Sequence, residues 1–182
     1  VIGIDENDLK NYPFDLKADK AFLSSFSKNV IVYNPDNDEM YPSGIKKNSY
    51  NTKRKAYKNS HKFISEKLCD LIKIEIDIKN IDIAKHLIEK NIPLCAHIGL
   101  LPQTIKSKSG YRKYGKSKHE AKQLYDLAVD LDKLGTQVIL IECLENSLAR
   151  RISENCNAPV IGIGSGKGID GQVAVILSLI HI

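Results

Sequence analysis

The sequence predicts an α/β fold, namely a (β/α)8 barrel of which this chain contains about half. Two observations support this prediction. From residue 53 onward, apolar residues alternate between helical and strand spacing, which gives parallel strands joined by crossover helices. That pattern leaves a barrel or a doubly wound sheet. The polar residues favour the barrel, because they stand near the C-terminal ends of the predicted strands, where a barrel assembles its active site.

Length, composition and charge fit one soluble globular domain. The chain has 182 residues, 42% apolar and 27% charged, which excludes collagen-like, mucin-like and wholly disordered chains. Its 27 basic and 22 acidic residues leave a formal charge of +5, which suits an anionic metabolite as well as a nucleic acid. The cysteines lack the spacing of a zinc site, and we expect buried free thiols of a cytoplasmic protein. They are Cys69, Cys95, Cys143 and Cys156.

The two ends of the chain predict neither a membrane span nor a secretory signal. The longest apolar stretch, residues 173–182, is shorter than the roughly 20 residues that a spanning helix needs. Residues 1–12 lack a basic start followed by an apolar run, and the missing initiator Met suggests a cut N-terminus. Residues 1–48 contain one convincing strand, Val30 to Tyr33, and a loop from Asp36 to Ser43. We expect this part to be divergent from, or unrelated to, the rest.

Residue spacing justifies the first two pairs of helix and strand. Apolar residues three or four apart predict a helix over residues 53–67, and a strand over 71–75 follows it. The second helix has one apolar face, made of Ile83, Ala84, Leu87 and Ile88. After a break at Asn91, residues 92–97 form the second predicted strand.

The remaining elements repeat this order. A longer helix is predicted over residues 117–134, with Gly135 as its C-terminal stop. Its apolar face consists of Ala121, Leu124, Leu127, Ala128 and Leu131. A strand over 138–142, a short helix over 147–155 and a strand over 159–164 complete the pattern. Strands that are almost continuously apolar predict a sheet covered on the side against which the helices pack.

Four polar residues near the strand ends are candidate site residues. Lys73 and Glu75 share one side of their strand, and a surface ion pair is the alternative to a functional role. His97 ends an apolar run, where a core histidine is the alternative to a site residue. Glu142 follows four apolar residues, so it is either a strand end that faces water or a buried base.

Two further segments give weaker signals. Gly166, Gly168 and Gly171 match a GxGxxG pattern, but without a directly preceding strand we expect no dinucleotide site. We expect a strand-to-helix loop whose backbone amides could face an anion. A basic cluster with two interleaved tyrosines could contact phosphates, and a solvated loop is the favoured interpretation. Its members are Lys106, Lys108, Tyr111, Arg112, Lys113, Tyr114, Lys116, Lys118 and Lys122.

Several motifs together resemble one enzyme family. Residues Ile92 to Thr104, IPLCAHIGLLPQT, resemble the signature I-P-V-x-[AG]-H-[IL]-G-L-x-P-Q-[ST] of the ketopantoate hydroxymethyltransferases. Leu71 to Glu75 resembles the V-K-[IL]-E strand of that family, and Gly110 to Gly115 resembles its G-[FY]-K-V-Q-G loop. Two later stretches between residues 139 and 172 follow the order and spacing of the family. The resemblance covers roughly Ser49 to Ile176.

The resemblance implies a (β/α)8 barrel of the phosphoenolpyruvate/pyruvate type, with this chain as roughly its second half. It implies Mg2+ as cofactor, and transfer of a hydroxymethyl group from 5,10-methylenetetrahydrofolate to 3-methyl-2-oxobutanoate in pantothenate and coenzyme A synthesis. By motif, Glu142 is the proton acceptor and Glu75 belongs to the metal site. Lys73 contacts the oxo acid, and His97 lines the site. The partners implied are the oxo acid and the folate, with no nucleic acid and no membrane, and the complete protein is expected to be a cytoplasmic homo-oligomer.

The chain departs from the family pattern in three places. The metal-binding aspartates of the family lie in V-G-D-S and D-[LM]-P-x-x-[ST]-Y motifs; residues 1–48 lack the first, and Gly44 stands at the Asp of the second. Ile76 and Asp77 replace the glycines that usually follow the family's Glu. Residues 177–182 break the pattern and resemble a translated sequencing adapter. We therefore expect a partial catalytic domain over 49–176, an artefactual tail, and no hydroxymethyltransferase activity of the chain alone.

Two other functions stay open. A Mg2+-dependent lyase or mutase of the phosphoenolpyruvate mutase and isocitrate lyase type would also use oxo acids, and the HIGLLPQ segment argues against it. A nucleic-acid-binding module built on the basic cluster would lose binding steeply with added salt.

Overall fold

The computed structural model of this chain describes residues 50–102, 104–105 and 112–173. Contacts between residues divide the chain into two units, Val1–Lys47 and Asn48–Ile182, and the described residues belong to the second. The strand expected at Val30 to Tyr33, the loop from Asp36 to Ser43 and the tail at 177–182 lie outside the described residues. So do Lys106, Lys108 and Tyr111 of the basic cluster.

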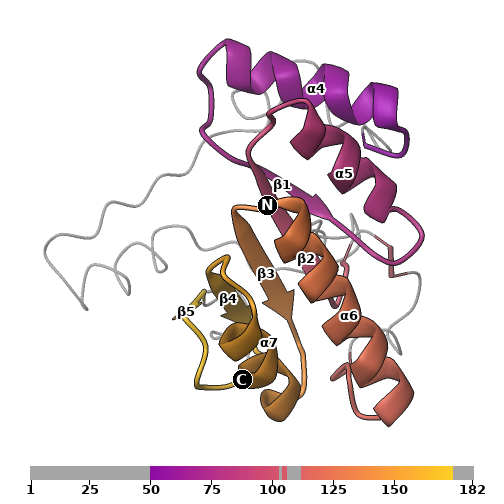
Figure 1. The fold of residues 1–182 in the computed structure, drawn as a ribbon, viewed down its shortest axis with the longest axis vertical. Helices are drawn as coiled ribbons and strands as arrows, with labels where there is room; N and C mark the ends of the chain where they lie inside the picture. Colours follow the sequence, from indigo (N-terminus) through magenta and orange to yellow (C-terminus); the bar gives the residue numbers. More distant parts are fainter. Residues whose placement is uncertain (1–49, 103, 106–111, 174–182) are drawn as a thin grey trace, which may run out of the picture. The chain divides into compact units, whose positions relative to one another are not determined.

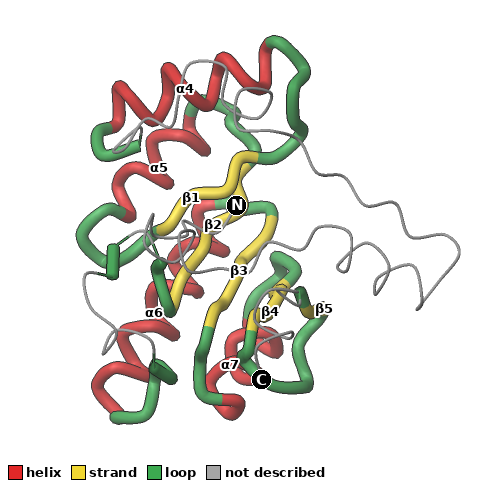
Figure 2. Tube along the Cα trace, turned by 180° about the vertical axis from the view of Figure 1, so that it is seen from behind, coloured by secondary structure: helices red, strands yellow, loops and turns green. Residues whose placement is uncertain are grey.

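The described residues form a parallel sheet with helices on one face. The strands, in their order across the sheet, are β1 (Ile72–Glu75), β2 (Leu94–Gly99), β3 (Val138–Glu142), β4 (Val160–Ile163) and β5 (Gly171–Gln172), and all neighbours are parallel. The helices are α4 (Lys53–Ser65), α5 (Ile81–Glu89), α6 (Lys118–Leu134) and α7 (Asn146–Asn155). In Figure 1 the helices lie in front of the sheet, and from behind, in Figure 2, the strands come to the front.

This arrangement agrees with the predicted fold class and with the predicted parallel strand pairing. Strands in sequential order, with their helices on a single face, are compatible with part of a (β/α)8 barrel. The α/β class and the parallel pairing are confirmed. Closure into a barrel stays a prediction, because the five strands that the structure describes form an open sheet.

Most elements lie within two residues of their predicted bounds, and two differences have clear reasons. Strand β2 begins at Leu94 instead of Ile92, because Pro93 has no N–H to donate and Ile92 N donates to Leu87 O of α5 at 3.0 Å. The glycine-rich segment is not a strand-to-helix loop, since the next described element is strand β5. Val173 N donates to Gly162 O at 2.9 Å, which holds the chain alongside β4.

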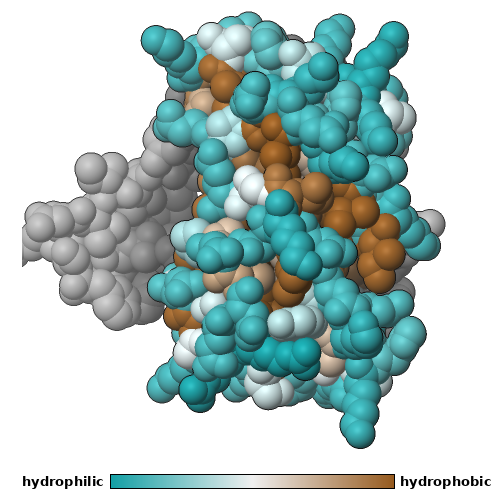
Figure 3. Space-filling view, in the orientation of Figure 1, coloured by the Kyte–Doolittle hydropathy of each residue, from teal (hydrophilic) through white to brown (hydrophobic). Residues whose placement is uncertain are grey.

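The core lies between the sheet and the helices. Its fully buried side chains include Leu87, Leu94, Ile98, Leu131, Ile139, Ile141 and Ile152. The outer surface of the helices is mostly hydrophilic, with an apolar band across it in Figure 3. No helix of the described part is long and apolar enough to cross a membrane.

The cysteines are free thiols, as expected, but only one is fully buried. Cys95 on β2 is buried, whereas Cys69, Cys143 and Cys156 are half-buried. The prediction of burial is therefore wrong for three of the four. Cys143 lies in the turn after β3, and Cys156 is the C-terminal cap of α7. Element ends approach the surface even when apolar runs adjoin them, which explains the difference.

Candidate active site

One face of the sheet carries the four candidate residues. Alternate residues of a strand point to opposite faces. The core residues Ile74, Ala96 and Ile141 lie on the helix-covered face, so their sequence neighbours Glu75, His97 and Glu142 lie on the other. Lys73 shares the face of Glu75. The register places Glu75 beside His97, and Gly99 beside Glu142, at the carboxyl ends of adjacent strands.

His97 and Glu142 make the central contact of this face. His97 Nε2 lies 3.0 Å from Glu142 Oε2, and the two side chains are 2% and 10% exposed. The distance is that of a hydrogen bond, but the ring N–H does not align with the oxygen, and neither ring nitrogen has a hydrogen-bond partner within the described part of the chain. The carboxylate is therefore buried beside a polar ring without being saturated by donors.

Lys73 and Glu75 differ in exposure. Lys73 is exposed, and Glu75, at the end of β1, is half-buried. Lys73 stands opposite Cys95, one row of side chains before Glu75 and His97. Burial raises the pKa of the Cys95 thiol, and the positive charge of Lys73 lowers it in part. A protonated thiol is a poor nucleophile and metal ligand, so Cys95 is not added to the candidate residues of this face.

The backbone of Glu142 is held by strand β2 on one side. Leu100 N donates to Glu142 O at 2.9 Å. Gly99 has a φ of +95°, and a Cβ there would stand 2.4 Å from Glu142 O and 2.2 Å from Leu144 Cδ1. Only glycine allows this conformation and this close approach, which gives Gly99 of the family-like segment a physical reason.

Ser165 holds the backbone on both sides of Glu142 from the side of β4. Its hydroxyl accepts a hydrogen bond from Leu144 N at 3.1 Å and lies 3.1 Å from Ile141 O and 3.2 Å from Ile163 O. Between these partners Cys143 adopts a left-handed conformation, with a φ of +54°. The sequence prediction missed Ser165, because it examined the glycines for anion binding. The available signal was a hydroxyl residue between two glycines just after an apolar strand.

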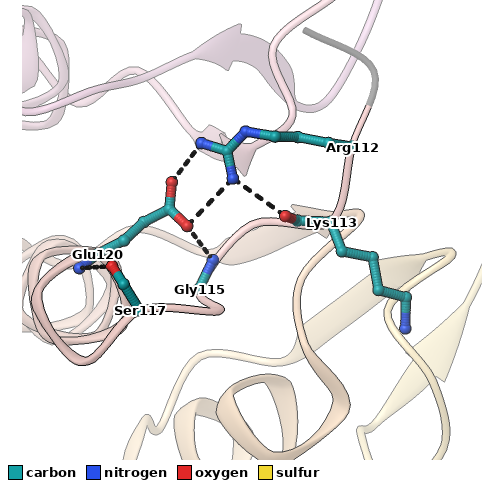
Figure 4. A network of polar contacts seen from close by, with 5 residues as sticks. All are labelled: Arg112, Lys113, Gly115, Ser117 and Glu120. Atoms are coloured by element: carbon teal, nitrogen blue, oxygen red, sulfur yellow. Dashed lines mark hydrogen bonds and ion pairs between the residues drawn. The ribbon is translucent and has the colours of Figure 1, made fainter. Parts of the chain in front are cut away.

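The loop before α6 packs on the turn that follows Glu142. Tyr114 N donates to Cys143 O at 2.8 Å, and Glu145 N donates to Tyr114 O at 2.8 Å. Figure 4 shows what fixes this loop: Glu120 accepts hydrogen bonds from both terminal nitrogens of Arg112 and, at 2.6 Å, from Gly115 N. The described members of the basic cluster are thus largely a solvated loop and helix start, as favoured from sequence.

The described residues do not complete a metal site. No group of three or more His, Cys, Asp or Glu side chains that could hold a metal gathers within residues 50–102, 104–105 and 112–173. Glu75 offers one carboxylate, whereas Mg2+ takes six oxygen ligands in near-octahedral geometry. The expected cofactor therefore does not fit the donor set of this part of the chain alone.

Comparison with known proteins identifies two sequence families. The model of the ketopantoate hydroxymethyltransferase family matches residues 41–182. The model of the pantoate-beta-alanine ligase family matches residues 4–75, less than half of the chain. The two matches overlap over residues 41–75, which include α4 and β1.

Curated relatives extend the first match. A 3-methyl-2-oxobutanoate hydroxymethyltransferase of Campylobacter curvus is 43% identical over 127 residues, which are 70% of this chain and 47% of that protein. Proteins of the same name from Buchnera aphidicola of Schizaphis graminum and from Vibrio cholerae are 40% and 37% identical over 134 residues, 74% of this chain and 51% and 50% of theirs. The chain spans about half the length of the curated relatives it matches.

Proposed function

The chain belongs to the ketopantoate hydroxymethyltransferase family, and from that premise we propose that it supplies the base of a hydroxymethyl transfer to an oxo acid. The proposed substrate is 3-methyl-2-oxobutanoate, and the proposed one-carbon donor is 5,10-methylenetetrahydrofolate. The observation that carries the proposal is the buried contact between His97 and Glu142, at the carboxyl ends of β2 and β3.

Glu142 is proposed to remove the proton from the carbon beside the keto group. Its carboxylate accepts the proton, and the electron pair of the broken C–H bond stays on the oxo acid as an enolate. The enolate carbon forms the new C–C bond to the methylene carbon of the folate, while the C–N bonds of that carbon break and tetrahydrofolate leaves. Water supplies the oxygen of the new hydroxyl group. Positioned general bases contribute about 10²–10⁴-fold to such steps. The lack of an aligned hydrogen bond from His97 suits this role, because a carboxylate already saturated by hydrogen bonds would resist taking up a proton.

The other residues of this face have proposed supporting roles. Lys73 is a cation one row away, placed to attract the carboxylate of the oxo acid or the developing enolate charge. His97 orients the Glu142 carboxylate. Glu75 is proposed to belong to a Mg2+ site, and such a site needs ligands beyond those of the described residues.

A hybrid enzyme tests the proposal. Residues 49–176 would replace the stretch of the Campylobacter curvus relative with which they align, and that protein would supply the rest, because the chain covers only 47% of it. The hybrid should restore growth without added pantothenate to a bacterium that lacks its own hydroxymethyltransferase. A hybrid with Glu142→Gln should fail, whereas one with Glu145→Gln, a neighbouring carboxylate outside the contact with His97, should succeed. A soluble, folded hybrid that forms no product from the oxo acid would contradict the proposal.

The second family match favours another candidate for part of the chain. Residues 4–75 are similar to pantoate-beta-alanine ligases. The described portion of that stretch contains helix α4 and strand β1, and β1 is the strand of the parallel sheet that carries Glu75. The geometry of the described residues therefore supports the hydroxymethyltransferase over the ligase. Ligation of pantoate to beta-alanine by the purified chain would favour the ligase instead.

A further inference from the structure

Ser165 is a buried polar residue that the proposed reaction does not use. It lies between β4 and β5 and is 1% exposed. A hydroxyl carries one proton and two acceptor positions. Ser165 therefore accepts from Leu144 N and shares its own proton between the carbonyls of Ile141 and Ile163.

The three partners surround Glu142. Ile141 directly precedes it, Leu144 follows it by two residues, and Ile163 is its register partner on β4. Ile163 O also accepts from Cys143 N at 2.8 Å. The Ser165 hydroxyl and the Ile163 carbonyl therefore together hold the turn from Glu142 to Leu144.

From this arrangement we infer that Ser165 is a positioning residue, which holds the Glu142 carboxylate against His97. The inference rests on the proposed role of Glu142. Without the hydroxyl, Leu144 N–H would be a buried donor with no partner, which is unfavourable because its lost hydrogen bond to water is not replaced. The turn relieves that cost only by moving. Because β2 fixes the carbonyl of Glu142 through Leu100 N, the movement passes to its side chain.

The contact itself can be observed without turnover. The test uses the full 182-residue chain, labelled with 15N and 13C in its five histidines. A His97→Gln variant assigns the ring signals of His97 in the NMR spectrum. Glu142→Gln should displace these signals, and this displacement defines the spectrum of His97 without its carboxylate neighbour.

Ser165→Ala should move the His97 signals through the larger part of the displacement seen in Glu142→Gln. The matched control is Thr136→Val. Thr136 is 4% exposed at the opposite end of β3, and its hydroxyl has no hydrogen-bond partner within the described residues, so its loss should leave the His97 signals in place. A change in the His97 signals that is specific to Ser165 distinguishes positioning from a general loss of packing.

Ser165→Cys keeps the side-chain volume with a much weaker hydrogen-bonding group, and it replaces the alanine variant if that variant does not fold. Unchanged His97 signals in either folded variant would overturn the inference. So would failure of both variants to fold while Thr136→Val folds, because Ser165 would then be a folding determinant. The proposed function is tested separately by the hybrid enzyme, so an inactive hybrid with a Ser165-dependent His97 spectrum would reject the reaction and keep the positioning.

Discussion

Two carboxylates at opposite ends of the sheet are held in opposite ways. Asp132, near the C-terminus of α6, lies beside the start of β4. Its Oδ1 accepts from Asn157 N at 2.9 Å and Ala158 N at 2.8 Å, and its Oδ2 accepts from Asn157 Nδ2 at 3.1 Å. Glu142, at the carboxyl end of β3, has its backbone fixed on both sides, whereas its carboxylate faces His97 without an aligned hydrogen bond.

The comparison separates a structural carboxylate from the one that we propose as the base. Burial raises the pKa of Asp132, but the hydrogen bonds from Ala158 and Asn157 outweigh it, and the net pKa is lowered. Taking up a proton would weaken those hydrogen bonds, so Asp132 is a poor base. Its hydrogen bonds connect the end of α6 to the start of β4. The carboxylate of Glu142 instead lies 3.0 Å from His97 Nε2 without an aligned hydrogen bond, which suits its proposed role as the base. This division agrees with the general rule for (β/α) folds, with chemistry at the carboxyl ends of the strands and stability at the amino ends.

The largest expected effect is on proton removal. In the hybrid enzyme, Glu142→Gln should slow exchange of the C3 proton of the oxo acid into deuterated water by about 10²–10⁴-fold, because it deletes the base. Binding of the oxo acid should stay largely intact. Asp132→Asn should leave the exchange rate unchanged. NMR of the substrate measures both rates, and an exchange rate in Glu142→Gln equal to that of the unmodified hybrid would remove Glu142 from the reaction.

The second effect concerns the close approach of β2 to Glu142. Gly99→Ala should lower the free energy of unfolding by roughly 2–4 kcal/mol, since it combines a left-handed backbone with overpacking against Glu142 O and Leu144. Gly135→Ala is the matched control. Gly135 has a nearly equal φ of +94°, but the nearest atom to a Cβ there is Ile88 Cγ2 at 3.7 Å. Its cost should be only the conformational one, about 1 kcal/mol.

Urea unfolding of the full chain measures both glycine variants. Equal losses in the two would mean that the carboxyl end of β2 tolerates a Cβ, and that the packing around Glu142 is looser than the structure describes.

The third effect lies at the amino end and depends on pH. Asp132→Ala should lower the free energy of unfolding by about 0.5–1.5 kcal/mol near neutral pH, because it removes the acceptor of the Asn157 and Ala158 donors, and water replaces part of this loss at the exposed Asn157. A carboxyl whose pKa is lower in the folded than in the unfolded chain stabilises above its ordinary value of 3.8, and this contribution is lost as the pH falls through the folded pKa. The difference between wild type and variant should therefore shrink below pH 3.8. A difference that is constant with pH would show that the charge of Asp132 does not contribute.

Periodicity and capping residues were sufficient to predict most of the fold. Helix α6 begins after Ser117, whose hydroxyl accepts from Glu120 N at 3.2 Å, and ends at Gly135, as predicted. Strand β5 was missed because its two residues are too few to show a period. The candidate residues were found at the strand ends by alternation, and the structure places His97 and Glu142 in contact.

The side-chain contacts that hold the site could not be predicted in this way. Ser165 acts on residues 21 and 24 positions away in the sequence, and such contacts leave no periodic signal. The left-handed conformation of Cys143 is likewise imposed by its neighbours and not by its residue type. The roles of Lys73 and Glu75 follow from the family resemblance and stay predictions.

The smallest expected effect tests whether the loop at the carboxyl end is held by charge. The hydrogen bond from Arg112 lowers the pKa of Glu120, burial raises it by less, and the backbone donors Gly115 and Lys116 of the preceding loop lower it further, so the net pKa is below 4.5. Its contribution to stability is therefore present above pH 4.5 and lost as the pH falls through the folded value.

Glu120→Gln keeps an acceptor for Gly115 N and removes the charge. Because the pair with Arg112 is partly exposed, we expect a loss of about 0.5–1 kcal/mol in the free energy of unfolding near neutral pH. Asp126→Asn, which breaks the exposed pair with Lys122 on the same helix, should cost no more than about 0.5 kcal/mol. Urea unfolding at pH 7 and pH 3 measures the two losses, and amide hydrogen exchange at Tyr114 should quicken in Glu120→Gln alone, because only that variant loosens the loop packed on the turn after Glu142. Equal exchange at Tyr114 in both variants would show that the backbone hydrogen bonds of Tyr114 with Cys143 and Glu145 hold this loop without help from the ion pair.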